Sequence, residues 1–567
     1  MDNRATQSVE PVAHRPVGLK DPEFIVGGLL LLGVLIVGLC TASDYGITTD
    51  EFIFDPYGPK ALAWYTSGFT DRSLFGYYDN YLYGPWFQIL VAAAQQSFHF
   101  ADPFTVRHAV TFVVGLAGIA ALIPIGRLAI GPWAGLAGAV LCLTTGNLYG
   151  HLFFTPNDVP FLAAMTWATL AIIVMARHPV PTWPATVAAG FFCGLAIATR
   201  FGGMLSQVYL VGAMALCALD VLSTAKNDRL KSLGAVGVRT LGALVVAWIA
   251  AVALWPWLQA AHPVARFMEA YDYFIRSYVQ FRFPAWGQTI SSAALPWHYI
   301  PGQLLARLPE GFVALLVIAA LFGAVAVGRF ASACNAQLRQ SGWGGALACG
   351  SELAESRGLL VVTVAALGPP LFVIARGSVI FDALRHLLFV LPMLALLAGW
   401  ALLKLMPLLL RLPAYGIGII VLHLATTVAT LVYLHPLEYV ALNGFAGGVA
   451  GAPGRFDLDY WSAGATEAVR RLEARLARDP PARFATRPPR VMVCIGWREP
   501  LVGPMFRQPW IVATVPKDAD FAIEPERWPC NGAVPGTVID TVQRFGVTFA
   551  RTFEISQPAT GGAPPPR

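Results

Sequence analysis

The chain has 567 residues, of which 56% are hydrophobic and 13% are charged, and its formal net charge is +6 at pH 7. A soluble protein of this length needs more polar residues to cover its surface, so the composition excludes an ordinary soluble globular protein. The modest positive charge is spread over short connections between apolar segments. Such a pattern is typical of membrane topology and argues against a nucleic-acid-binding protein.

Apolar segments long enough to cross a hydrocarbon core of ~30 Å recur through the first three quarters of the chain. The sequence therefore predicts a mainly α, polytopic membrane protein with a polar tail at 1–23 and a spanning domain at 24–434. We expect about 11 transmembrane helices, at residues 24–42, 106–126, 131–149, 159–176, 183–199, 203–220, 240–258, 309–328, 358–375, 386–404 and 414–434.

Basic residues are distributed unevenly between the two sets of connections. If the N-terminus lies in the cytoplasm, the cytoplasmic connections hold most of the bases, including Arg127, Arg177 and Arg357. This agrees with the positive-inside rule, and an odd number of spans then places the C-terminal region outside. We expect a multi-pass protein of the bacterial inner (plasma) membrane with a periplasmic C-terminal region.

Two long outer loops are predicted, at 43–105 and 259–308. The first contains an aromatic stretch at 77–86, followed by an apolar segment, Phe87–Phe98, that is too short to span and that we interpret as an interfacial helix. The second is rich in Trp, Tyr and Pro, as expected of a loop at headgroup depth. Anchoring alone remains an alternative explanation for the second loop.

The composition changes after the last span. Residues 435–556 are predicted to form a small α/β module with an amphipathic helix at 466–478 and short strands at 490–496 and 510–515, and the Pro/Gly-rich tail at 557–567 is predicted to be disordered. Cys494 and Cys530 are the two cysteines of this region. In an oxidising periplasm they could form a disulfide, and the sequence leaves this open.

Charged residues gather where spans meet the outer face. Asp50 and Glu51 follow the first span, Asp158 begins the fourth, Arg200 follows the fifth, and the sequence Asp382 to Arg385-His386 precedes the tenth. Taken singly, each is more typical of a structural helix end. Because all lie on the same predicted face, we expect Asp50, Asp158, Arg200 and Arg385 to converge around one outward-opening cavity at headgroup level.

These residue types suit the transfer of a group from a lipid phosphate. A carboxylate can act as general base on an acceptor hydroxyl, and arginine binds phosphate through two hydrogen bonds while neutralising its charge. The sequence has no GxxxxGK[ST] motif, no Rossmann glycine pattern after a strand and no HExxH motif. An energy-rich lipid donor explains why no nucleotide site is needed.

At these residues the chain resembles the GT-C glycosyltransferases, specifically the family 39-like branch of protein O-mannosyltransferases and lipid A aminoarabinose transferases. The resemblance covers most of residues 24–440. It rests on the Asp50-Glu51 pair, Asp158 in the next outer turn, and the basic entry to a late span that ends in Pro392. The stretch from His435 to Trp461 is similar to bacterial members of the same group.

The resemblance implies a role for each candidate residue. Asp50 would be the catalytic base with Glu51 as its neighbour in the motif, and Asp158 would shape the cavity. Arg200 and Arg385, with His386, would bind the donor phosphate. Aminoarabinose transferases place a Lys before a Pro-Pro in the first loop, whereas residues 83–86 here read Tyr-Gly-Pro-Trp.

This departure leaves the identity of the donor open. Lys60 and Arg72 are alternative ligands of the phosphate. The carboxylates could hold a hard divalent cation, but family 39-like members generally work without a metal, so no metal and no cofactor is expected.

We therefore predict an inverting glycosyltransferase that moves a monosaccharide from a polyprenyl-phosphate carrier to a hydroxyl of a lipid, glycan or protein. Its partners would be this donor, the acceptor and membrane lipids, with no nucleic acid. One alternative is a transporter or flippase of lipid-linked sugars, which would place ionisable residues or broken helices near the bilayer midplane. The other is a non-catalytic scaffold of envelope assembly.

Overall fold

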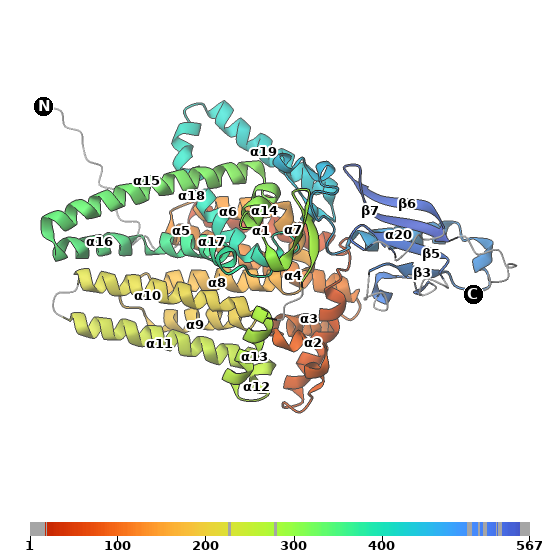
Figure 1. The fold of residues 1–567 in the computed structure, drawn as a ribbon, viewed down its shortest axis with the longest axis horizontal. Coiled ribbons are helices and arrows are strands. Elements are labelled where there is room, and N and C mark those ends of the chain that lie inside the picture. The colour runs from red at the N-terminus through yellow and green to blue at the C-terminus, as the bar shows by residue number, and fades with distance from the viewer. Residues whose placement is uncertain are drawn as a thin grey trace.

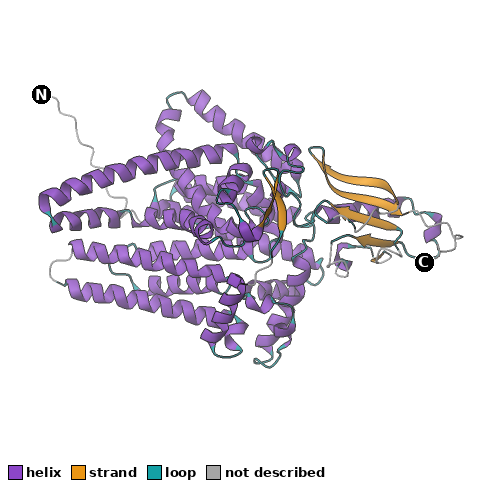
Figure 2. Ribbon diagram, in the orientation of Figure 1, coloured by secondary structure: helices purple, strands orange, loops and turns teal. Residues whose placement is uncertain are grey.

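The computed structural model describes residues 18, 20–224, 228–276, 280–495, 502–508, 511–513, 519–528, 530 and 536–555. A bundle of roughly parallel and antiparallel helices forms most of the molecule, and a small mixed sheet lies beyond one end of the bundle (Figure 1). The described strands gather at that end, whereas the rest of the bundle is helical (Figure 2). Of the predicted tail at 1–23, residues 1–17 and 19 lie outside the described residues, as does the whole of the predicted tail at 557–567.

The helices follow the chain from the first apolar segment to the C-terminal module. The first half contains α1 (Pro22–Thr41), α2 (Glu51–Thr66), α3 (Trp86–Ser97), α4 (Pro103–Ala120), α5 (Leu122–Ala129), α6 (Ala134–Thr144), α7 (Gly146–Phe154), α8 (Asp158–Met175), α9 (Trp183–Ile197), α10 (Leu205–Thr224) and α11 (Arg229–Leu254). The second half contains α12 (Pro256–Gln259), α13 (Pro263–Arg276), α14 (Tyr299–Arg307), α15 (Glu310–Ser341), α16 (Trp343–Glu355), α17 (Arg357–Arg376), α18 (Leu391–Leu409), α19 (Pro413–Leu434) and α20 (Gly464–Arg478).

The membrane-spanning architecture predicted from the sequence is confirmed. Among the described residues, nine helical segments are long and apolar enough to cross a membrane, counting α4 and α5 as one. The two remaining predicted spans correspond to the shorter apolar helices α6 and α9. The fourth span, α8, is almost entirely enclosed by its neighbours, whereas α1, α15 and α19 expose most of their apolar surface, as helices facing lipid do.

Several boundaries differ from those predicted. The span expected at 131–149 bends at Thr145, where the backbone is extended, so that it forms α6 and the buried helix α7. Helix α15 runs 13 residues beyond the predicted end at 328 and is followed by α16, which the apolar pattern did not predict. Helix α2 was also not predicted, because its interior contains Pro56 and Pro59, which usually end a helix.

The loop regions at the sheet end of the bundle carry short elements. The interfacial helix expected at 87–98 is α3, whose predicted helical state is therefore confirmed. The region 259–308 contains α13, α14 and a hairpin in which β1 (Arg282–Ala285) pairs antiparallel with β2 (Gln288–Ser291). Figure 1 shows α2, α3, α12 and α13 at the end of the bundle that faces the sheet.

The C-terminal module contains a five-stranded sheet in the order β4-β3-β5-β7-β6. Its strands are β3 (Arg490–Val493), β4 (Val512–Ala513), β5 (Phe521–Pro525), β6 (Gly536–Arg544) and β7 (Val547–Ile555). Strand β3 is parallel to β4 and β5, and β7 is antiparallel to β5 and β6. The amphipathic helix α20 packs against β5, β6 and β7, and a disulfide joins Cys494 to Cys530.

Candidate functional site

The predicted site residues are carried by the ends of four different elements. Asp50 immediately precedes α2, Asp158 begins α8, Arg200 follows α9, and Arg385 begins the short 3-10 helix η6 (Arg385–Val390) that leads into α18. Their positions in the sequence are up to 335 residues apart. Only the fold of the bundle can bring such residues together.

The four side chains form one hydrogen-bonded network, which we call the arginine cluster. Arg385 donates from Nη2 to Asp50 Oδ2 at 2.7 Å and from Nε to Asp158 Oδ2 at 3.2 Å. Arg200 donates to the other oxygen of Asp158, Oδ1. The two arginines therefore share one carboxylate, and Arg385 bridges this carboxylate to Asp50.

Burial strengthens the interactions within the arginine cluster. Only 3% of the Asp158 side chain is exposed, compared with 17% for Asp50, 13% for Arg385 and 15% for Arg200. The guanidinium of Arg385 also lies over the indole ring of Trp461, 4.2 Å from its centroid. Charges that are partly shielded from water and fixed by several partners interact more strongly than a surface pair.

Local structure explains how Arg200 is held. The backbone before it packs against the first outer loop so closely that a Cβ at Gly84 would lie 1.5 Å from the carbonyl oxygen of Ala198. The indole of Trp86 donates to Thr199 Oγ1 at 2.7 Å. The Tyr-Gly-Pro-Trp stretch at 83–86, which lacks the lysine of aminoarabinose transferases, therefore braces the turn that presents Arg200.

Glu51 lies in a different group of side chains, although it is adjacent to Asp50 in sequence. It accepts hydrogen bonds from the backbone N–H and the hydroxyl of Thr48, each at 2.9 Å, and its own N–H donates to the Thr48 hydroxyl at 3.4 Å. This reciprocal pair is a capping box at the start of α2. Glu51 Oε1 also lies 3.1 Å from His108 Nε2 and 3.7 Å from Arg107 Nε.

We call this second group the capping cluster, defined by Thr48, Glu51, Asp55, Arg107 and His108. Arg107 and Glu51 are each about 1% exposed, and Arg107 also lies 3.6 Å from Asp55. The capping cluster joins the start of α2 to α4. Its contacts explain why a glutamate follows Asp50 without giving that glutamate access to a substrate.

His386 lies within electrostatic reach of Arg200 and Arg385, whereas Lys60 and Arg72 contact aromatic rings of the first outer loop. The ring of His386 packs against Phe381, with centroids 4.7 Å apart. Lys60, on α2, lies over the ring of Tyr77, and Arg72 lies over the ring of Phe75. The structure thus brings Asp50, Asp158, Arg200 and Arg385 together and leaves the two alternative phosphate ligands in the first loop.

Sequence reasoning did not assign a site role to three residues that line or support the cluster. Asp382 accepts from Arg385 Nη1 at 2.7 Å, Trp461 covers Arg385, and Arg527 lies 3.7 Å from Asp382. Asp382 had a sequence signal, since it lies three residues before Arg385. Trp461 and Arg527 come from the C-terminal module, where periodicity predicts secondary structure but not which residues reach the bundle.

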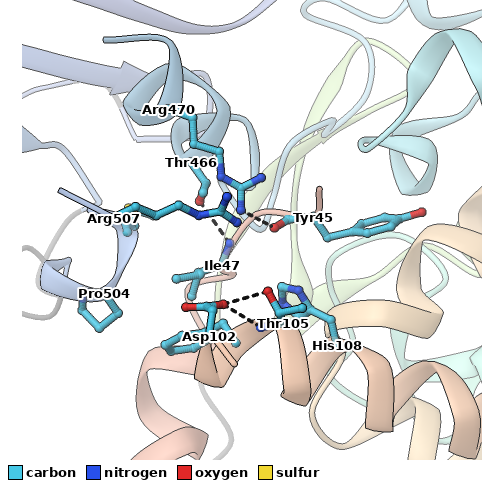
Figure 3. A pocket seen from close by; sticks show the side chains of 11 residues that line it. Tyr45, Ile47, Asp102, Thr105, His108, Thr466, Arg470, Pro504 and Arg507 are labelled. Atoms are coloured by element: carbon cyan, nitrogen blue, oxygen red, sulfur yellow. Dashed lines mark hydrogen bonds between the residues drawn. The ribbon is translucent and has the colours of Figure 1, made fainter. Parts of the chain in front are cut away.

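The C-terminal module also forms hydrogen bonds with the loop that carries Asp50. Figure 3 shows Thr466 and Arg470 of α20 reaching this loop: the Thr466 hydroxyl accepts from the backbone N–H of Ile47 at 3.0 Å, and Arg470 donates to the carbonyl of Tyr45 at 3.2 Å. The N–H of Thr49 donates to the carbonyl of Trp461 at 3.3 Å. A side chain at Gly46 would collide with the carbonyl of Ala463, 2.4 Å away.

Two cavities flank this junction between bundle and module. A space of about 10 Å³, enough for a single water, lies beside Asp102, Arg470 and Arg507 (Figure 3). A pocket of about 360 Å³ lies between α19 and the start of α15, and its wall includes Arg307, Glu310, Thr427 and Asn443. Neither cavity is lined by a residue of the arginine cluster. The four side chains converge as predicted and are joined to one another by ion pairs.

Within the described part of the chain, no group of three or more His, Cys, Asp or Glu side chains is arranged to hold a metal ion. Each carboxylate of the arginine cluster faces a guanidinium. The arrangement can bind an oxyanion by exchanging carboxylate partners for phosphate oxygens, and it can hold a carboxylate ready to accept a proton.

No protein-family model and no curated protein sequence matches the chain. Among solved structures, ArnT from Cupriavidus metallidurans in the apo state is similar over 93% of this chain and 98% of its own, with 16% identity and a TM-score of 0.43. The same protein bound to undecaprenyl phosphate gives 14% identity and a TM-score of 0.43, covering 93% of this chain and 97% of its own. The archaeal oligosaccharyltransferase AglB from Archaeoglobus fulgidus, in complex with an inhibitory peptide and a dolichol-phosphate, gives 13% identity and a TM-score of 0.41, covering 84% of this chain and 63% of its own. ArnT and AglB are GT-C glycosyltransferases, the superfamily that the sequence motifs resemble.

Proposed function

We propose that the protein is a membrane glycosyltransferase that moves a monosaccharide from a polyprenyl-phosphate carrier to a hydroxyl acceptor, at the membrane face where the arginine cluster lies. The observation that carries the proposal is the bridge from Arg385 to Asp50 and Asp158, completed by Arg200. It unites, at one end of the bundle, a candidate proton acceptor and two residues that bind phosphate.

The donor phosphate competes with carboxylates for the two arginines. When Arg385 and Arg200 turn their N–H groups toward phosphate oxygens, Asp50 loses its counter-charge and becomes a stronger base. Binding of the donor thus prepares Asp50 for the reaction. Arginine suits this exchange because its planar fork donates to carboxylate and phosphate with the same geometry.

The reaction then follows from these positions. Asp50 accepts the proton of the acceptor hydroxyl while the acceptor oxygen attacks the anomeric carbon. The bond between that carbon and the phosphate oxygen breaks, and its electron pair leaves with the carrier phosphate. Arg385 and Arg200 stabilise the charge that develops there, and attack from the opposite side inverts the configuration of the sugar.

The membrane assignment completes the proposal. The basic connections lie at the bundle end opposite the arginine cluster, where Arg127 pairs with Glu23 and Arg357 pairs with Asp220. By the positive-inside rule, the cluster and the C-terminal module face the periplasm of a bacterial inner membrane.

The test is turnover by the purified full-length chain in lipid nanodiscs, with a radiolabelled sugar on undecaprenyl phosphate as donor and isolated envelope lipids and glycans as acceptors. The proposal requires release of undecaprenyl phosphate together with labelled acceptor. Movement of the intact donor across a proteoliposome membrane, with no change in its covalent structure, would instead support a transporter. If neither occurs for any sugar tried, the enzyme assignment is wrong.

We further propose that the reaction needs no metal ion, because two guanidinium groups already supply positive charge to the leaving phosphate. Turnover should then remain unchanged after exhaustive dialysis against EDTA, compared with the same enzyme supplemented with Mg²⁺ or Mn²⁺. A loss that either ion restores would contradict this part of the proposal.

A further inference from the structure

The turn that precedes Arg385 has an unusual backbone. Asp382 and Ala383 are consecutive, buried, non-glycine residues with positive φ angles of 55° and 59°. Such residues cost free energy unless the surrounding structure holds them, and they gather where a side chain must be presented in one orientation. Something outside the turn must therefore stabilise it.

The carboxylate of Asp382 is the link between this turn and two arginines. One oxygen accepts from Arg385 Nη1 at 2.7 Å, and the other lies 3.7 Å from Nη2 of Arg527. Arg385 therefore has a carboxylate on each of three sides: Asp50, Asp158 and Asp382. Asp382 is in turn paired with Arg527, a residue of the C-terminal module.

Arg527 is firmly fixed in the module. It follows strand β5 and forms an ion pair with Asp457. The neighbouring backbone is anchored on both sides, because the N–H of Glu526 donates to the carbonyl of Phe549 at 2.9 Å and Cys530 is joined to Cys494 in a disulfide. Only 13% of the Arg527 side chain is exposed.

The bundle holds Asp457 from the other side. Arg307, at the end of α14, donates from Nη2 to the carbonyl of Asp457 at 2.6 Å. Bases and acids thus alternate along one path, from Asp457 through Arg527 and Asp382 to Arg385 and Asp50. The path leads from the sheet to the proposed catalytic base and crosses the junction between module and bundle.

We propose that Arg527 is a positioning residue that fixes Arg385 for the carrier phosphate through Asp382, so that the C-terminal module takes part in donor binding. The inference rests on the proposed function, since it assumes that Arg385 binds the phosphate. Arg527 does not itself touch the reacting atoms. Arg527 keeps Asp382 ionised and stabilises the backbone turn at Asp382 and Ala383. The Asp382 carboxylate then sets the orientation of the Arg385 guanidinium group.

The charges that face Asp382 predict a particular pH dependence. Arg385 comes from its own segment, Arg527 and Asp457 come from the module side, and Tyr299 and Tyr460 lie nearby. Burial raises the pKa of Asp382 to about 6, against the opposing effect of both arginines. Arg527 is one of the two positive charges that lower the pKa of Asp382 against the effect of burial. Without Arg527, the pKa of Asp382 therefore rises further, and the carboxylate becomes protonated at a higher pH.

The test compares Arg527→Met with Arg551→Met in the full-length protein. Arg551 is a matched control because it pairs with Glu524 in the same sheet, at 3.2 Å, and is not part of the path to Arg385. We expect Arg527→Met to raise KM for the donor and Kd for undecaprenyl phosphate about tenfold, with a smaller change in kcat. Its donor KM should begin to rise, as pH falls, at a higher pH than in the wild type.

Rescue and coupling separate positioning from a general loss of structure. Arg527→Lys keeps the charge and should recover most of the donor affinity. Arg527→Gln, which removes the charge but keeps a polar side chain, replaces Arg527→Met if that variant does not fold, and the same rise in donor KM is expected of it. In the Asp382→Asn background, Arg527→Met should cause little further change, because residues that act through one another are not additive. Full additivity of the two changes would overturn the route through Asp382.

The outcomes also distinguish this inference from the proposed function. If the wild type binds undecaprenyl phosphate and turns over, but Arg527→Met matches Arg551→Met in KM, Kd and pH profile, only the inference fails. If the wild type neither binds undecaprenyl phosphate nor transfers a sugar, the proposed function fails and the inference fails with it.

Discussion

The arginine cluster and the capping cluster begin at adjacent residues, yet their carboxylates differ in exposure and in the elements that supply their partners. Asp50 is 17% exposed and its partners come from the ends of α8 and η6, whereas Glu51 is about 1% exposed and is bound to Thr48 and to α4. Both are carboxylates that face arginines. The difference lies in whether the partners can be exchanged for a ligand.

The geometry of a helix start explains the divergence. Successive residues of a helix point about 100° apart, so two adjacent carboxylates at its first turn face different neighbours. Glu51 turns back to cap the helix, while Asp50 turns toward the ends of α8 and η6. An Asp-Glu pair at such a position therefore supplies one residue for the site and one for the helix.

The largest expected effect separates the two carboxylates by activity. Asp50→Asn keeps the size of the side chain but cannot accept a proton, so kcat should fall roughly 10²–10⁴-fold, while the amount of folded protein in nanodiscs stays unchanged. Glu51→Gln provides the control, since each folded molecule of it should retain most of its turnover. Equal loss of turnover in both variants would contradict the assignment of a catalytic role to Asp50 and a structural role to Glu51.

Arg385 should follow Asp50 in size of effect. Arg385→Met removes donors to Asp50, Asp158 and Asp382 and leaves the leaving phosphate less stabilised, so kcat/KM for the donor should fall roughly 10²–10³-fold. The measurement is initial rates over a range of donor concentrations. Lys60→Met is the comparison. A greater loss of kcat/KM in Lys60→Met would indicate that the phosphate binds to the first loop instead.

The order of the two variants should be reversed when stability is measured: Glu51→Gln should lose more free energy of unfolding than Asp50→Asn. Glu51→Gln can still form the capping box, but it leaves the buried Arg107 with a weaker set of counter-charges, so the free energy of unfolding should fall by about 3 kcal/mol. A thermal unfolding curve in detergent, compared with that of Asp50→Asn, measures the difference. If Asp50→Asn is the less stable variant, the capping cluster does not have the structural role assigned to it.

A smaller effect concerns Asp459, a fully buried carboxylate of the segment that covers the arginine cluster. Burial raises its pKa from 3.8 to about 6, although Tyr439 and two backbone N–H groups donate to it. A raised pKa means that the folded state binds the proton more tightly. Its contribution to stability is therefore complete below about pH 3.8 and is lost as pH rises through about 6.

Asp459→Asn removes this dependence. Relative to the wild type, the variant should gain on the order of 2 kcal/mol between pH 4 and pH 7, measured as the difference between the two unfolding temperatures at each pH. A constant difference across the range would show that Asp459 keeps its ordinary pKa.

Much of the fold could be predicted from the sequence because membrane spans depend on composition over a length of about 20 residues. Helix ends were harder to predict. The apolar pattern of 131–149 gave no sign that the backbone is extended at Thr145. Helix α2 was not predicted because Pro56 and Pro59 lie inside it and proline usually ends a helix. Helix α16 carries Gly and charged residues and is held by packing against α10 and α15 rather than by apolar periodicity.

The site was predictable to the extent that its residues lie at the ends of spans on one face. Asp50, Asp158, Arg200 and Arg385 satisfy that condition, and the structure brings them together. Trp461 and Arg527 do not, because they reach the site from the C-terminal module, whose packing on the bundle depends on long-range contacts. Nor did the sequence indicate that Glu51 would turn away, although the Thr48-x-x-Glu51 spacing was a visible sign of a capping box.

The loop that holds Asp50 has a consequence for how the molecule is made. Its backbone is bonded to Trp461, Thr466 and Arg470, which are synthesised more than 400 residues later. A nascent chain can insert its early spans while this loop still lacks its partners. The bonds that hold this loop can therefore form only when translation is nearly finished, and a chain released early would enter the membrane without the contacts that fix Asp50.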